Sequence, residues 1–261
     1  MKIAVIGAGA MGGAMVEGWV RSGRVSAADV TVTAAHQSTL ERYAQLGVRV
    51  TTDNAEAAMS ADIVVVAVKP WIVEQVLCQI KPVINPSRHI VVSVAAGVSG
   101  DSLKAMLAGE GGSLPRVFIA IPNIAMSVGC SMTFIVPVNA GDEDTRRIEA
   151  LFNLAGTSLI VDESRLGTGT ALASCGIAYA MRYVRASMEG GVQLGFKADV
   201  SRDIVLQTVK GAVALLQAGG GHPEAEIDKV TTPGGLTIRG LNAMERAGFT
   251  NAVIRGLVGD K

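Results

Sequence analysis

The sequence contains little cysteine and few aromatic side chains. Only 3 cysteines occur in 261 residues, and aromatic residues make up 4% of the chain. Cys78, Cys130 and Cys175 lie far apart and lack the spacing of metal ligands or of a disulfide framework. We therefore expect reduced thiols, a cytoplasmic location and no metal site.

Long apolar runs and an excess of charge of one sign are missing as well. The apolar run at residues 63–68 is far shorter than the about 20 residues that a membrane-spanning helix needs. We therefore expect no membrane partner, and the balance of 23 Lys and Arg residues by 23 Asp and Glu residues argues against a nucleic-acid partner. The sequence opens on a strand-like segment, so we expect no signal peptide.

Glycine, in contrast, is abundant, and its most informative positions are near the start of the chain. The apolar residues 2–6 predict a strand, and Gly7, Gly9 and Gly12 follow in a G-x-G-x-x-G pattern that opens a helix. Gly7 would allow a tight turn, Gly9 the approach of a pyrophosphate, and Gly12 close packing of helix on strand. The alternative is a structural turn in another α/β protein. The predicted dinucleotide-binding segment comprises Gly7, Ala8, Gly9, Ala10, Met11 and Gly12.

Residues 1–161 alternate between strand-like and helix-like segments. This alternation predicts an α/β fold, with a parallel, doubly wound sheet of the Rossmann type. Strands are expected at residues 2–6, 30–34, 63–67, 89–94, 116–120, 132–136 and 158–161, and helices include residues 39–46 and 143–155.

Residues 162–261 show only helical patterns and predict a second, all-helical domain. One long helix is expected at residues 163–195, although its glycines could interrupt it, and a second at 199–218 with Asp199 or Ser201 as its N-cap. Shorter helices are expected near 236–247 and 251–258.

The helix expected at residues 199–218 is apolar on more than one face, as Ile204, Leu206 and Leu215 illustrate. A helix that is apolar nearly all round must be buried. About 100 residues offer too little protein to cover such helices, so we expect a dimerisation domain in a homodimer or larger homo-oligomer.

The segment after the second expected strand favours NADP over NAD. An NAD site usually has an acidic residue there for the ribose 2′-hydroxyl, but the first acidic residue here is Glu41, inside the next helix. A 2′-phosphate would meet no repulsion and could accept hydrogen bonds at the helix N-terminus. The alternative is a solvated loop without ligand contacts, and NAD remains possible. The residues expected to bind this end of the cofactor are Ala35, His36, Gln37 and Ser38.

The C-terminal region carries the pattern V-x-T-P-G-G-x-T at residues 230–237. This pattern resembles the signature loop of the pyrroline-5-carboxylate reductase family. Further similar stretches are A-V-K-P at residues 67–70, A-A-G-V at 95–98, Q-T-V-K-G-A at 207–212 and H-P at 222–223. The resemblance covers essentially the whole chain, and the Pro-Gly-Gly loop is its most specific part.

The resemblance implies an NAD(P)H-dependent oxidoreductase that reduces 1-pyrroline-5-carboxylate to L-proline in proline biosynthesis. Hydride passes from NADPH to the C=N bond, and the protein orients the ring and binds its carboxylate. Backbone N–H groups of the Pro-Gly-Gly loop and the following helix offer an anion site, and Thr237 adds a hydroxyl donor. The substrate-binding residues implied are Asn123, Cys175, Gly234, Gly235, Leu236 and Thr237.

Thr237 and Lys69 are the candidate catalytic residues. The alternative for Thr237, with Thr231 and Thr232, is a helix cap, and that for Lys69 is an exposed charge at a strand end. Asn54 matches a family position at the adenosine end of the cofactor, and its alternative is capping the helix at residues 55–60. The resemblance adds to the cofactor site Asn54, Ala67, Val68, Lys69, Pro70, Ala95 and Ala96.

Two stretches near the family's active site differ from its usual pattern. Ile124 stands where the family has threonine, and Cys175 and Ile177 lie in a stretch that usually reads G-S-G-P-A-Y. These changes leave two alternatives, a reductase for a related cyclic imine and a non-catalytic nucleotide-binding regulatory protein. A β-hydroxyacid dehydrogenase is disfavoured because residues 163–195 contain neither the lysine nor the asparagine that those enzymes need.

Overall fold

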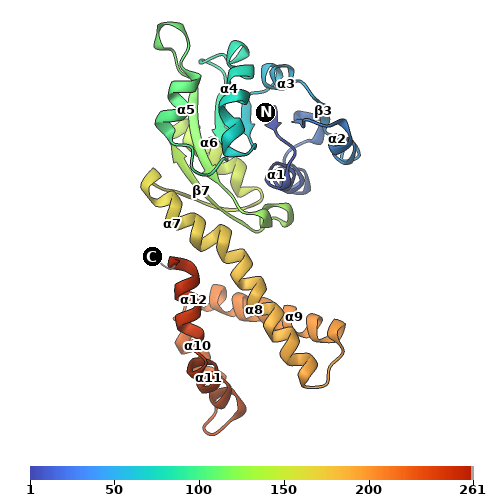
Figure 1. Cartoon of the computed structure of the whole chain (residues 1–261), viewed down its shortest axis with the longest axis vertical. Helices are drawn as coiled ribbons and strands as arrows, with labels where there is room; N and C mark the ends of the chain where they lie inside the picture. The colour runs from blue at the N-terminus through green and yellow to red at the C-terminus, as the bar shows by residue number, and fades with distance from the viewer. Residues whose placement is uncertain (260–261) are drawn as a thin grey trace. The chain divides into compact units, whose positions relative to one another are not determined.

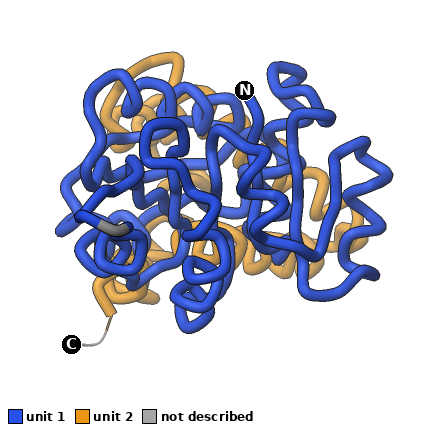
Figure 2. Tube along the Cα trace, turned by 90° about the horizontal axis from the view of Figure 1, so that it is seen from above, with its two compact units in different colours: residues 1–174 blue, residues 175–261 orange. Residues whose placement is uncertain are grey.

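Figure 1 shows the computed structural model of the protein, which describes residues 1–259 apart from the side chain of Glu110. The chain forms two compact units, residues 1–174 and the residues from Cys175 onward (Figure 2). The expected domain limits, 1–161 and 162–261, stay a prediction.

The first unit is built on an eight-stranded sheet with the order β3-β2-β1-β4-β5-β6-β7-β8. The predicted α/β, Rossmann-type fold is confirmed. The strands are β1 (Ile3–Ile6), β2 (Val30–Thr33), β3 (Arg49–Thr51), β4 (Ile63–Val66), β5 (Ile90–Ser93), β6 (Arg116–Ile121), β7 (Ser131–Pro137) and β8 (Gly156–Ile160).

The sheet departs from the prediction at two places. β7 runs antiparallel to β6, whereas all other neighbouring strands are parallel. The connection at residues 122–130 is shorter than the dozen or so residues of a parallel crossover, which explains the reversal. The edge strand β3 was not predicted, because three residues are too few to show an alternating pattern.

Helices cover both faces of the sheet because its strands are apolar on both faces. Ile3 and Val5 point into a core with Trp19 and Phe152, whereas Ala4 and Ile6 point into a second core on the other face. The helices of the first core are α1 (Ala10–Arg21), α2 (Gln37–Ala44) and α6 (Asp142–Asn153), and those of the second are α3 (Asn54–Ser60), α4 (Val73–Ile80) and α5 (Gly100–Leu107).

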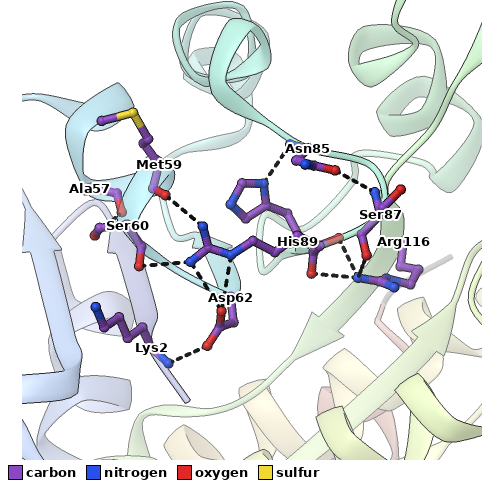
Figure 3. A network of polar contacts seen from close by, with 10 residues as sticks. Lys2, Ala57, Met59, Ser60, Asp62, Asn85, Ser87, His89 and Arg116 are labelled. Atoms are coloured by element: carbon purple, nitrogen blue, oxygen red, sulfur yellow. Dashed lines mark hydrogen bonds and ion pairs between the residues drawn. The ribbon is translucent and has the colours of Figure 1, made fainter.

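A polar network ties together the amino ends of the parallel strands (Figure 3). Asp62, before β4, accepts hydrogen bonds from the Lys2 backbone at 2.9 Å and from Arg88 at 3.3 Å. These interactions, led by the Lys2 backbone hydrogen bond, lower the pKa of Asp62. Arg116, at the start of β6, donates to the Arg88 carbonyl at 2.6 Å. This network lies at the amino ends of the strands. Ligands bind in open α/β sheets at the opposite edge, where the carboxyl ends of the strands lie.

The helix expected at residues 163–195 is interrupted. A 3₁₀ turn (Glu163–Arg165), α7 (Leu166–Gly169) and a π-helical stretch (Thr170–Cys175) precede α8 (Gly176–Gln193). Gly169 lies against Phe134, where an added Cβ would come within 2.8 Å of the ring. The small residue at this position therefore allows the segment to pass close to β7.

The second unit also contains α9 (Ala198–Gly219), α10 (Pro223–Lys229), α11 (Leu236–Arg246) and α12 (Phe249–Val258). The predicted N-cap of α9 is wrong, because the helix begins at Ala198 and Lys197 occupies the cap position. Ser201 instead donates to the Met188 carbonyl of α8 at 2.8 Å. α10 was not predicted, although Pro223 at its first position is a known start signal. Among the helices of residues 1–259, none combines the length and apolar character needed to cross a membrane.

Candidate functional site

A cavity of about 580 Å³ opens at the carboxyl ends of β1, β2, β4 and β5. The register explains why the loops meet there, because Ile6 pairs with both Thr33 and Val66, and Val66 pairs with Ser93. The structure brings together most of the predicted cofactor residues in its lining, namely Gly7, Ala8, Gly9, Ala10, Met11, Ala35, His36, Ala67, Val68, Lys69, Pro70, Ala95 and Ala96.

The glycine motif forms a close-packed cradle. Gly7 has φ +105°, and an added Cβ there would lie 2.7 Å from the Ala67 carbonyl oxygen. A Cβ at Gly12 would lie 1.9 Å from the Gly7 carbonyl oxygen, so only glycine fits there; Gly12 is buried in α1 and does not line the cavity. A Cβ at Gly9 would meet nothing within 4 Å, so the backbone is open on the cavity side. This cradle fits a dinucleotide pyrophosphate.

The N-terminus of α1 strengthens the fit to an anion. Gly9 is the N-cap, no side chain caps the helix, and the first turn carries no acidic residue. The first N–H groups of a helix have no partner within it and carry a partial positive charge. Ala10 and Met11 both line the cavity, so these donors lie where a phosphate would be bound.

The loop after β2 contains no carboxylate. His36 is the N-cap of α2 without a side-chain hydrogen bond, is exposed and lines the cavity. Thr39, in the first turn of α2, lines the cavity too and was missed by the sequence. Gln37 and Ser38 are exposed but do not line it, so their role stays a prediction.

Asn54 does not line the cavity, and its side-chain amide is hydrogen-bonded to neighbouring side chains. Its Oδ1 accepts from the Thr33 hydroxyl at 2.6 Å, and its Nδ2 donates to Gln79 at 2.7 Å. The alternative of helix capping is wrong, because Asp53 is the N-cap of α3 and accepts from Ala55 and Glu56. Direct binding of the cofactor by Asn54 stays a prediction.

Lys69 stands at the rim of the cavity. It is exposed and precedes the 3₁₀ turn Pro70–Ile72, and its ammonium forms no ion pair with any of the described residues. Further lining residues that the sequence analysis did not find are Ala34, Ile72, Val94 and Ile124. The strand-end position of Ala34 and Val94 could have revealed them, whereas Ile124 comes from the reversed β6–β7 connection.

A second, mainly apolar cavity of about 380 Å³ shares Ala95 and Ala96 with the first. Val98, Ile119 and Leu166 contribute to its walls. Gly97, with φ +81°, lies in the turn after β5 and lines this second cavity. The two cavities therefore adjoin each other at Ala95 and Ala96.

Asn123, by contrast, is buried away from both cavities. Its Oδ1 accepts from the Ala125 backbone at 3.1 Å, and its Nδ2 donates to the Ala173 carbonyl at 3.3 Å. It caps the 3₁₀ turn Ile124–Val128 that brings Ile124 to the cofactor cavity. Its predicted role in substrate binding stays a prediction.

The Pro-Gly-Gly loop leaves the N-terminus of α11 open. Gly235 is the N-cap without a side-chain hydrogen bond, and Gly234 has φ +68°. Capping by the threonines, the alternative, is wrong, because no described side chain makes a capping hydrogen bond at the start of α11; Thr231 donates instead to the Ile227 carbonyl at 2.7 Å. The exposed Thr237 hydroxyl has no hydrogen-bond partner among the described residues. Leu236 is 81% exposed, and Cys175 is exposed as a free thiol.

A glycine cradle at the end of β1 in a doubly wound sheet, followed by a helical unit, defines a dinucleotide-binding oxidoreductase with an appended helical domain. Family models agree with this class. Residues 2–97 match the model described as NADP oxidoreductase coenzyme F420-dependent, and residues 163–259 match pyrroline-5-carboxylate reductase dimerisation.

Relatives extend this agreement over the whole chain. The chain is 37% identical to pyrroline-5-carboxylate reductase 1 of Dictyostelium discoideum over 98% of its own length and 48% of the relative, so it spans about half of that protein. It is 36% identical to the pyrroline-5-carboxylate reductase of Methanosarcina acetivorans, with 97% and 94% of the two chains covered.

A solved structure is similar as well. The crystal structure of Plasmodium falciparum pyrroline carboxylate reductase with NADP bound has a TM-score of 0.86 and 26% identity, covering 98% of this chain and 94% of that one. The chain belongs to the pyrroline-5-carboxylate reductase family. The resemblance predicted from the sequence is therefore confirmed.

Proposed function

We propose that this protein reduces 1-pyrroline-5-carboxylate to L-proline with NADPH. The observation that carries this proposal is the glycine-cradle cavity in a member of this family, with an apolar space beside it. NADPH, when bound, supplies the hydride for the C=N bond of the ring. The ring nitrogen carries the proton of the iminium form, so no strong general acid is needed from the protein.

The chain's own residues provide the cofactor contacts. The backbone N–H groups at Ala10 and Met11 would hold the pyrophosphate, and His36 and Thr39, which line the same cavity, would donate hydrogen bonds to the 2′-phosphate. The absence of a carboxylate before Glu41 removes the repulsion that would disfavour NADP. Lys69, at the rim of the same cavity, adds positive charge near the cofactor and is a candidate catalytic residue.

The substrate carboxylate is held by the Pro-Gly-Gly loop. Gly234 and Gly235 expose backbone N–H groups at the start of α11, and the Thr237 hydroxyl is free to donate to the carboxylate or to the ring nitrogen. Ile124 sits in the cofactor cavity wall where the family has threonine, and Cys175 is a second change. These two side chains therefore adjust the fit of the ring.

The protein is a homo-oligomer, and we propose that its active site lies between subunits. The helical units of two chains would interleave, and the Pro-Gly-Gly loop of one subunit would complete the site on the sheet unit of its partner. The exposed apolar side chains of α8, α9 and α12 support this arrangement. The three free cysteines support a cytoplasmic location.

The direct experiment follows NADPH oxidation by absorbance after addition of 1-pyrroline-5-carboxylate. Turnover is expected, as is proline-dependent reduction of NADP at alkaline pH, because the loss of protons drives the reverse reaction. Turnover only with a six-membered cyclic imine would identify a related imine reductase. Bound NADPH without turnover in either direction would contradict an enzymatic role and favour a regulatory protein.

Replacement of Thr237 tests the substrate site. Thr237→Val removes one hydroxyl donor to a charged group, a loss of about 1.5–3 kcal/mol. We expect kcat/KM for the imine to fall by roughly 10- to 150-fold, with NADPH affinity unchanged. Thr237→Ser, which keeps the hydroxyl, is the control and should retain most of the activity. Unchanged kinetics in Thr237→Val would show that the hydroxyl takes no part.

A further inference from the structure

A chain of hydrogen bonds reaches the glycine cradle from behind the cofactor cavity. The Gly7 N–H, at the tight turn, donates to both the carbonyl oxygen of Thr33 at 3.1 Å and its Oγ1 at 3.3 Å. Thr33 is only 1% exposed and is not part of the cavity lining. It therefore contacts the cofactor-binding loop without being in a position to contact the cofactor.

The Thr33 hydroxyl is oriented by a second residue. Its hydrogen is donated to Asn54 Oδ1 at 2.6 Å. A hydroxyl has one hydrogen and two lone pairs, so this donation leaves the lone pairs of Oγ1 to accept from Gly7. Without Asn54, the hydroxyl could rotate and turn its hydrogen toward the Gly7 N–H.

Asn54 is oriented in turn by Gln79. Asn54 Nδ2 donates to Gln79 Oε1 at 2.7 Å, and this contact sets which end of the Asn54 amide faces Thr33. Gln79 lies on α4, Asn54 on α3 and Thr33 at the end of β2. We call Gln79, Asn54 and Thr33 the Gly7 relay.

We propose that the Gly7 relay positions the glycine cradle, so that Thr33, Asn54 and Gln79 are positioning residues for the pyrophosphate of the dinucleotide. The proposal rests on the proposed function only in its choice of NADPH as ligand. The Gly7 turn sets the direction of the chain from Ala8 to Met11, whose residues line the cavity. A backbone held in its bound conformation binds more tightly, because less ordering is needed on binding.

Thr33→Val tests the relay by removing the hydroxyl at nearly constant volume. NADPH affinity is measured by fluorescence titration of the folded protein without substrate, so the result does not depend on turnover. We expect the Kd for NADPH to rise by about 3- to 10-fold, the effect of one neutral hydrogen bond. The Kd for adenosine 2′-monophosphate, which has no pyrophosphate, should not change. A general disturbance of the structure would weaken the binding of both ligands.

Two control variants accompany it. Thr31→Val makes the same change two residues earlier on β2, where the hydroxyl has no hydrogen bond among the described residues, and should leave both Kd values unchanged. Thr33→Ser keeps the hydroxyl and should bind NADPH within about twofold of the natural protein. An unchanged Kd for NADPH in Thr33→Val, or an equal rise in the Kd values of both ligands, would overturn the proposal.

A double-mutant cycle separates the relay from direct cofactor contact by Asn54. Asn54→Ala should weaken NADPH binding in the natural protein but add nothing in the Thr33→Val protein, because its effect passes through the hydroxyl. Additive effects would show that Asn54 binds the cofactor itself and would overturn the relay. If Thr33→Val does not fold, Gln79→Leu serves instead, since Gln79 is exposed. Gln79→Leu should weaken the binding of NADPH but not the binding of adenosine 2′-monophosphate. Any other result rejects the proposal.

Discussion

His89 is a buried histidine far from the cofactor cavity, at the amino ends of the strands (Figure 3). Its Nδ1 accepts a hydrogen bond from the Asn85 backbone at 2.7 Å, an arrangement that requires the neutral ring. Burial lowers the pKa of His89 below its usual 6.5, and the charge of Arg88 lowers it further. The backbone of Ala61 and the charge of Asp62 oppose this shift only partly.

His89 therefore makes the stability of the protein sensitive to mild acid. Because its pKa is lower in the folded chain, the unfolded chain takes up the proton first as pH falls. The stability due to neutral His89 should be complete above about pH 6.5 and decrease as pH falls toward the folded-state pKa. Urea unfolding at a series of pH values measures this. His89→Gln should have a shallower pH dependence below about pH 6.5, and an identical slope would contradict the assignment.

At the scale of residues, the sequence predicted backbone-determined positions better than side-chain contacts. Gly7 and Gly12 were assigned correctly to a turn and a close contact, because only glycine satisfies either geometry. Thr39 was not predicted to line the cavity, since the sequence does not reveal which side chains of a first helical turn face a ligand. The cap of α9 was misassigned, and capping of α3 by Asn54, the alternative role, was wrong as well, because helix starts are uncertain by one or two residues from sequence.

At the scale of elements, the sequence predicted the strands that are buried on both faces. β1, β4 and β5 are short runs rich in Val and Ile, and their boundaries differ by at most a residue or two from the prediction. The direction of β7 and the π-helical stretch Thr170–Cys175 were not predicted. The direction of β7 follows from the short connection at residues 122–130, whereas the π-helical stretch leaves no periodic pattern in the sequence.

The packing of α1 on the 3₁₀ turn Ile124–Val128 allows a direct test. A Cβ at Gly18 would lie 2.2 Å from the Met126 carbonyl oxygen. Gly18→Ala gains about 1 kcal/mol in helix propensity, but the clash with backbone should cost about 1–3 kcal/mol or more. We expect a net loss of unfolding free energy in urea titrations. Arg21→Ala, at an exposed position on the same helix, should change it by less than about 0.5 kcal/mol. A more stable Gly18→Ala protein would show that this contact is loose.

At the scale of the whole molecule, the two units differ in how well each covers its own apolar side chains. The sheet unit buries two large cores. In the helical unit, Leu194 is 82% exposed, Leu215 61% and Val258 62%. A surface with this many apolar side chains is characteristic of a subunit interface, in agreement with the dimerisation model that matches residues 163–259.

Sedimentation measures the consequence for assembly. Interfaces of permanent homodimers bury about 2,000–5,000 Å², and such an interface should leave no folded monomer at micromolar concentration. We expect a dimer or a larger species throughout. Leu206→Glu, on α9, should shift the protein toward smaller or unfolded species, whereas Arg21→Ala, on the sheet unit, should not. An active monomer at micromolar concentration would contradict both the interleaved dimer and the shared active site.

The glycines of α1 also determine when the cofactor site can form during folding. Gly12, Gly13 and Gly18 make room for the Gly7 carbonyl, the Tyr43 hydroxyl and the Met126 carbonyl, respectively. Each glycine lowers the helix propensity of α1 by about 1 kcal/mol relative to alanine, so the helix is weak by itself. It becomes stable only after the sheet, α2 and the β6–β7 connection have come together around it. We therefore expect that a nascent or partly folded chain cannot capture NADPH and that cofactor binding is confined to molecules in which the sheet unit is complete.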